Sequence, residues 1–88
     1  MNFEKPNITR DDLRDLRKFL KKNCPGLKIT TGRGGWWRMT YVYGGGEHSR
    51  FTEEEKQFLT QIGLLPCTGF LSINMYQAEK ILQEVIRE

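Results

Sequence analysis

Leu27 to Tyr43, L-K-I-T-T-G-R-G-G-W-W-R-M-T-Y-V-Y, is the stretch that decides the fold of this 88-residue chain. β-Branched and aromatic side chains, which favour strands, stand on both sides of the glycine-rich segment 32–35. Glycines allow the chain to reverse there. The stretch therefore predicts an antiparallel hairpin with strands over residues 27–31 and 36–43.

Alternation divides the second predicted strand into two faces, because successive side chains point to opposite sides of a sheet. One face holds Trp37, Met39, Tyr41 and Tyr43, and the other holds Trp36, Arg38, Thr40 and Val42. The second set includes a charged and a hydroxyl side chain, so we expect Trp37, Met39 and Tyr41 to face the core. Trp36 and Arg38 then lie at the surface with Arg33 at the tip of the turn.

Helix signals precede the hairpin. Thr9 is a candidate N-cap with Asp12 in the capping-box position, and Pro25 favours an end near Asn23. The leucines of this segment recur at helical spacing, so one face of the helix is expected to be buried.

The remaining elements are marked by two further caps. Thr52 and Glu55 form a capping box, and Gly63 suits the end of a short helix. Residues 70–73 read as a short strand, and Asn74 can cap a final amphipathic helix whose buried stripe is Ala78, Ile81, Leu82, Val85 and Ile86. The sequence predicts an α+β fold: a single two-layer domain in the order α-β-β-α-β-α, with a three-stranded sheet and helices packed on one face.

Length and composition describe one small globular domain over residues 1–88. We expect residues 1–7 to form a loose arm and residues 44–50, which begin with three glycines, a flexible loop. No segment resembles a membrane span or a signal peptide, so we expect a cytoplasmic protein without membrane contact. A net charge of +3 favours an anionic partner, either nucleic acid or an acidic protein surface.

The first predicted helix carries the clearest basic surface. Arg10, Arg14, Arg17 and Lys21 are spaced four, three and four residues apart, which places them in one narrow stripe. One interpretation is a solvated helix flank whose long side chains cover the edge of the core. The other is a surface that contacts an anion, and the neighbouring Asp11 and Asp15 would neutralise part of its field.

The sequence shows no clear arrangement of catalytic residues. His48 is the single histidine and lies among glycines and polar residues, where nothing nearby would orient it. The two cysteines, Cys24 and Cys67, form no metal-binding motif, and we expect reduced thiols, although a disulfide would be open to an exported protein. We therefore expect no enzyme, no metal and no cofactor.

The region from Arg10 to Leu59 resembles a known class of small domains. Its basic helix is followed by Cys24-Pro25-Gly26-Leu27-Lys28, a strand, a glycine turn, an aromatic strand and a Thr-capped acidic helix. This pattern is similar to that of uncharacterised α+β domains associated with large polyvalent proteins of phages and mobile elements. The resemblance rests chiefly on Pro25, Gly26 and Lys28 and leaves the last third of the chain uncovered. It implies a mobile-element setting and transfers no catalytic residue.

Two functions remain open. The first is nucleic-acid binding, in which phosphates contact the helix stripe while Arg33, Trp36, Arg38 and Lys28 supply charge and a stacking surface on the hairpin. The second is protein interaction, for example as an accessory or inhibitor module of a phage or mobile element, through the same Trp and Arg residues or an exposed strand edge. Self-association is a variant of the second function, and the sequence leaves the oligomeric state open.

Overall fold

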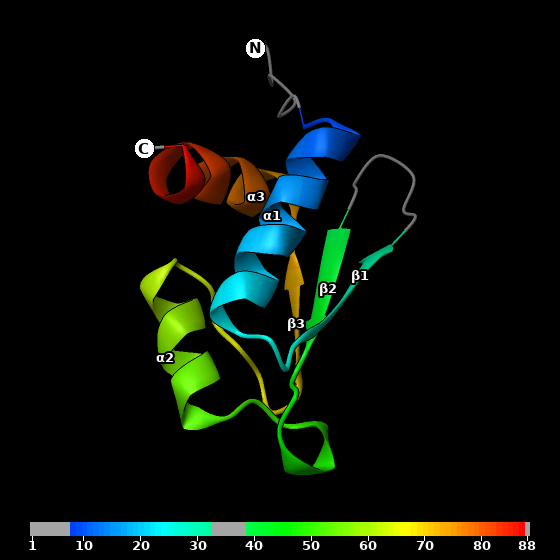
Figure 1. The fold of residues 1–88 in the computed structure, drawn as a ribbon, viewed down its shortest axis with the longest axis vertical. Coiled ribbons are helices and arrows are strands. Elements are labelled where there is room, and N and C mark those ends of the chain that lie inside the picture. The colour runs from blue at the N-terminus through cyan, green and yellow to red at the C-terminus, as the bar shows by residue number, and fades with distance from the viewer. Residues whose placement is uncertain (1–7, 33–38, 88) are drawn as a thin grey trace, which may run out of the picture.

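The structure, a computed structural model, describes residues 8–32 and 39–87. Its elements are α1 (Arg10–Asn23), β1 (Lys28–Gly32), β2 (Met39–Tyr43), the 3-10 turn η1 (Glu47–Ser49), α2 (Glu53–Gln61), β3 (Phe70–Ile73), α3 (Met75–Ile81) and the π-helical turn η2 (Leu82–Ile86). The helices lie over one face of the sheet (Figure 1). The predicted order α-β-β-α-β-α and the α+β class are confirmed.

The sheet is antiparallel throughout, with strand order β1-β2-β3. Val42 on the central strand pairs with Ile29 on one side and with Leu71 on the other. All three side chains are buried, together with Thr40 and Ile73 on the same face. The core lies between this face and the apolar stripes of the helices, which supply Leu16, Leu20, Leu59, Ile81 and Leu82.

The predicted core face of the second strand was wrong. Thr40 and Val42 are 1% and 0% exposed, whereas Met39 and Tyr41 are half-buried on the opposite face. Register partners of an antiparallel pair point to the same side of the sheet, so the buried Ile29 fixes Val42 as a core residue. Residues 33–38, which include Arg33, Trp36, Trp37 and Arg38, lie outside the described part of the chain.

Reciprocal capping boxes start each of the three helices, as predicted for α1, α2 and α3. At α2, the Glu55 N–H donates to Thr52 Oγ1 at 3.1 Å and the Thr52 N–H donates to Glu55 Oε1 at 2.8 Å. These bonds satisfy backbone donors that have no partner within the first helical turn. The sequence therefore fixes where each helix begins.

The segment 44–50, expected to be flexible, makes specific backbone contacts. The Gly44 N–H donates to the Gly69 carbonyl at 3.0 Å, and the Gly46 N–H donates to the Arg50 carbonyl at 2.8 Å. The close approach of Gly45 to Gly26 leaves no room for a side chain at position 45. Contacts distant in sequence thus hold a segment that has no local means of ordering itself.

The chain end departs from the predicted regular helix. From Leu82 the hydrogen bonding becomes π-helical, and Val85 is 37% exposed although the sequence pattern placed it in the buried stripe. A π turn rotates the following residues relative to a continuous α-helix. Among the described residues, no helix has both the length and the apolar character required to cross a membrane.

Candidate functional site

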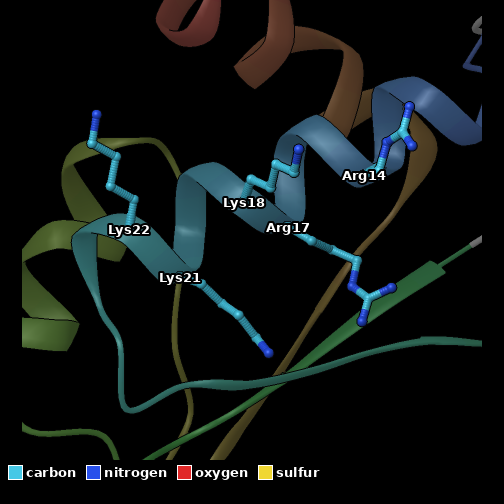
Figure 2. A pocket seen from close by; sticks show the side chains of 5 residues that line it. All are labelled: Arg14, Arg17, Lys18, Lys21 and Lys22. Atoms are coloured by element: carbon cyan, nitrogen blue, oxygen red, sulfur yellow. The ribbon is translucent and has the colours of Figure 1, made fainter.

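An open groove runs along one flank of α1. Its volume is about 400 Å³, and its described lining consists of Arg14, Arg17, Lys18, Lys21 and Lys22. Figure 2 shows Arg17 and Lys21 extending from α1 toward the strands, while Lys22 points away from them. We call this surface the basic groove. Its described lining contains no acidic side chain, so the groove attracts anions.

The groove arises from the way α1 buries its other side. Leu13, Leu16 and Leu20 face the core, which leaves the flanking positions in solvent. Lys21 and Lys22 also fall in the last turn of α1, where cations favour the negative end of the helix dipole. The charge is therefore placed by the same periodicity that builds the core.

Most of the charge in the groove is uncompensated. Arg14 donates to Asp11 Oδ1 at 2.8 Å, in an exposed ion pair that contributes little to stability. Within residues 8–32 and 39–87, no ion pair engages Arg17 or Lys21. Asp15 is exposed on the same helix and lowers the local field without entering the groove lining. An anionic ligand would therefore meet Arg17 and Lys21 without having to displace a described carboxylate from them.

Arg17 connects the groove to the edge of the sheet. Its guanidinium Nη2 donates to the Ile29 carbonyl of β1 at 3.4 Å. β1 is an edge strand, and the alternation of the antiparallel ladder, fixed by the Gly44 to Gly69 bond between the other two strands, turns the Ile29 carbonyl away from β2. The groove thus lies directly beside the outer edge of β1, with Arg17 held over that edge.

The predicted site residues are only partly brought together. Arg14, Arg17 and Lys21 line the groove, whereas Arg10, at the start of α1, is exposed but is not part of the lining. Lys28 is exposed on β1 and is the register partner of Tyr43, so its side chain lies on the face of the sheet opposite α1. Arg33, Trp36 and Arg38 lie outside the described residues.

Two lining residues were not assigned to the site from the sequence. Lys18 and Lys22 are one helical turn apart and extend the basic surface beyond the predicted stripe. The i, i+4 spacing of two lysines beside the stripe was the signal that could have identified them.

A second surface, which the sequence did not predict, is a group of aromatic side chains on the face of the sheet away from the helices. Tyr41, Tyr43 and Phe70 lie there because their register partners include the exposed Lys28 and Thr30. The ring centroids of Tyr41 and Phe70 are 5.8 Å apart with planes inclined by 19°, and those of Tyr43 and Phe70 are 5.5 Å apart. We call these three residues the aromatic row.

Outside the groove, the buried thiol of Cys24 is the cysteine whose protonation the fold alters. Cys24 is buried, and its pKa is raised by desolvation and by the nearby carboxylates of Glu55 and Glu54. Lys21 and Lys22, which precede it in the sequence, do not reverse this shift, so its thiol stays protonated at neutral pH. No cluster of metal-ligating side chains occurs among the described residues.

Comparisons with protein-family models, with curated proteins and with solved structures find no match to this chain.

Proposed function

We propose that the protein binds nucleic acid through phosphate contacts along the basic groove. The observation that carries this proposal is the gathering of Arg14, Arg17, Lys18, Lys21 and Lys22 on one flank of α1 around an open volume of about 400 Å³. Arginine and lysine contacts to phosphate release condensed counterions, which favours binding of a polyanion. Such contacts carry no base information, so the groove supports binding without strong sequence preference.

The shape of the groove suits an extended polyanion. It follows the axis of α1, so successive phosphates can meet Arg14, Arg17 and Lys21 in turn. Arg17 has donors in a planar fork, and only one hydrogen bond, to Ile29, engages it within the described residues. It can therefore hold its position on β1 while it donates to a phosphate.

The test is the dependence of affinity on salt. Titration of mixed-sequence single-stranded and duplex DNA and RNA should show log K falling linearly with log salt. Lys21→Gln should weaken binding and reduce the magnitude of the slope by about 0.7 to 0.9, the value for one lost phosphate contact. Fluorescence anisotropy at several salt concentrations measures both quantities.

Lys80→Gln is the matched control. Lys80 is also an exposed lysine in the last turn of a helix, but it belongs to α3 and does not line the groove. Its replacement should leave affinity and slope unchanged. Equal effects of the two substitutions would assign the binding to net charge, and a flat salt dependence would reject phosphate binding.

An acidic protein surface is the second candidate partner for the groove. The Arg14 to Asp11 ion pair shows that a groove side chain can reach a carboxylate at 2.8 Å, and arginine also suits bidentate carboxylate recognition. A pull-down from nuclease-treated lysate separates the two candidates. Retention of one protein partner, lost with Lys21→Gln and kept with Lys80→Gln, would favour protein interaction.

A further inference from the structure

The face of the sheet opposite the described helices carries three aromatic side chains whose rings are in contact. Tyr43 and Phe70 are 37% and 39% exposed, although aromatic side chains of this size are ordinarily largely buried. Phe70 touches both tyrosines, so the three rings form one row across β2 and β3. Contiguous exposed apolar side chains are common at contact sites.

The row is held in place by the strand beside it. The ring of Tyr41 lies over Gly32 of β1, where any side chain would collide with it. On its other side the same ring stacks against Phe70 at an inclination of 19°. Tyr41 is therefore fixed before any ligand arrives, and little conformational entropy is lost when a flat group packs on the row.

The charge around the row is positive. Lys28 stands opposite Tyr43 in the β1–β2 register and is exposed on the same face. The other described residues of this face are Thr30, Gly32, Met39 and Ser72, and none of them is acidic. Around the edge of β1, Arg17 brings the basic groove to the Ile29 carbonyl. Lys28 on this face and Arg17 at the Ile29 carbonyl thus place cations on two sides of the same edge strand.

We propose that the aromatic row stacks the bases of single-stranded nucleic acid while Lys28 and the basic groove contact its phosphates. Ring faces stack on any base, so the surface tolerates different sequences. In a duplex the bases are already stacked on one another and leave no face for Phe70 or Tyr43. This inference rests on the proposed function and adds to it the preferred substrate class, which is single-stranded rather than double-stranded.

The experiment separates stacking from charge. The full-length protein is titrated with a ten-nucleotide thymidine DNA, with the uridine RNA of the same length, and with an abasic DNA strand that carries the same phosphates. We expect at least one base-bearing strand to bind about tenfold more tightly than the abasic strand, because stacking contributes to every base contact. Equal binding of all three strands would overturn the stacking proposal and leave phosphate binding intact.

Two substitutions test whether the aromatic row causes the tighter binding of base-bearing strands. Phe70→Leu and Tyr43→Leu each remove a ring while keeping an apolar side chain, and each should weaken binding of the base-bearing strand by about 5- to 100-fold. Binding of the abasic strand should not change. Tyr76→Leu removes a ring that is 46% exposed on α3, and it should alter neither affinity. Equal loss for abasic and base-bearing strands would contradict the proposal.

The measurement remains decisive if one variant folds poorly. Circular dichroism melting establishes the folded state of each variant, and ring-proton chemical shifts of Phe70 and Tyr43 in the wild-type protein give a second readout. A base stacked on these rings should shift their resonances, whereas the abasic strand should not. Absence of binding to every strand would reject the proposed function and the inference together.

Discussion

Thr40 has a buried side-chain oxygen that finds no hydrogen-bond partner among the described residues. The residue is 1% exposed on the core face of β2, between Ile73 and Thr31 in the register. Burying an unpaired hydroxyl costs free energy that a methyl group of the same shape does not. This single residue also explains why the core face was misassigned, since a threonine beside arginine reads as a solvent position.

Replacing Thr40 by valine should therefore stabilise the protein. We expect Thr40→Val to raise the free energy of unfolding by about 1 kcal/mol, because it removes the unpaired hydroxyl and keeps the β-branched shape. Urea denaturation followed by circular dichroism measures the change. Thr30→Val, on the exposed face of β1, should shift stability by less than about 0.5 kcal/mol. A destabilised Thr40→Val protein would show that the hydroxyl has a partner.

Two glycines in contact should differ in their tolerance of a side chain. A β-carbon at Gly45 would collide with the backbone of Gly26, which cannot rotate away, so Gly45→Ala should cost about 1 to 3 kcal/mol. A β-carbon at Gly26 would lie 3.4 Å from the flexible end of Glu55, so Gly26→Ala should be nearly neutral. Thermal melting of both variants under identical conditions tests this order, and similar losses would contradict it.

At the scale of elements, α1 combines a cap, a buried stripe and a charged flank. The capping box placed its start at Thr9, and the leucine spacing placed its buried face correctly. The arginine and lysine spacing predicted a basic stripe, of which Arg14, Arg17 and Lys21 line the groove. Helical periodicity is a local property, so these features could be read directly from the sequence.

The cap of α1 should make stability depend on pH at the acidic end. The pKa of Asp12 is lowered chiefly by the backbone N–H of Thr9 and next by the Arg87 side chain. A carboxyl whose folded pKa lies below its unfolded value stabilises the fold above the unfolded pKa, near 3.8, and loses that contribution as pH falls through the folded pKa. Protonation in the folded state removes the negative charge that strengthens both contacts.

This pH dependence can be measured as the difference in stability between Asp12→Asn and the wild type. Asp12→Asn should be less stable than the wild type at pH 6, by about 1 kcal/mol for the weakened cap. The difference should shrink as pH falls below 3.8. Arg87→Gln removes only the Arg87 contact to Asp12, so it should lower stability by a smaller amount with the same dependence on pH. Urea midpoints between pH 6 and pH 2 test this, and a constant difference would contradict it.

At the scale of the whole molecule, the two ends of the described chain support one another. The Arg87 side chain forms an ion pair with Asp12 in the first turn of α1, and Leu82 of η2 belongs to the core cluster that α1 completes. Figure 1 shows the C-terminal helical segment lying beside α1. The last turns are therefore part of the domain and complete its core.

Substitutions at Leu82 and Val85 would test which side of the last helical turns is buried. Leu82 is 2% exposed, so Leu82→Ala should destabilise the protein by about 2 to 5 kcal/mol through lost packing and a cavity. Val85 is 37% exposed, and Val85→Ala should cost less than about 1 kcal/mol. Equilibrium denaturation provides both values. Comparable costs would indicate that the final turn is a continuous α-helix, as its sequence pattern alone predicts.

The sequence by itself determined the features that depend on neighbours along the chain. It set the helix starts through Thr9, Thr52 and Asn74, the element order, and the cations on the flank of α1. Caps, turns and helical faces need only residues within a few positions of each other. These interactions are therefore independent of how the rest of the chain packs.

Only the tertiary structure decided which face of β2 meets the helices. Alternation produces two candidate faces, and the charged and hydroxyl side chains beside Val42 favoured the opposite set with Met39 and Tyr41 as the core face. The observed register pairs the buried Ile29 of β1 with Val42, which places Val42 on the core face. That choice depends on register between strands and on where α1 packs, and neither is a local property. The same register places Tyr41, Tyr43 and Phe70 on the face of the sheet opposite the described helices, outside the core cluster.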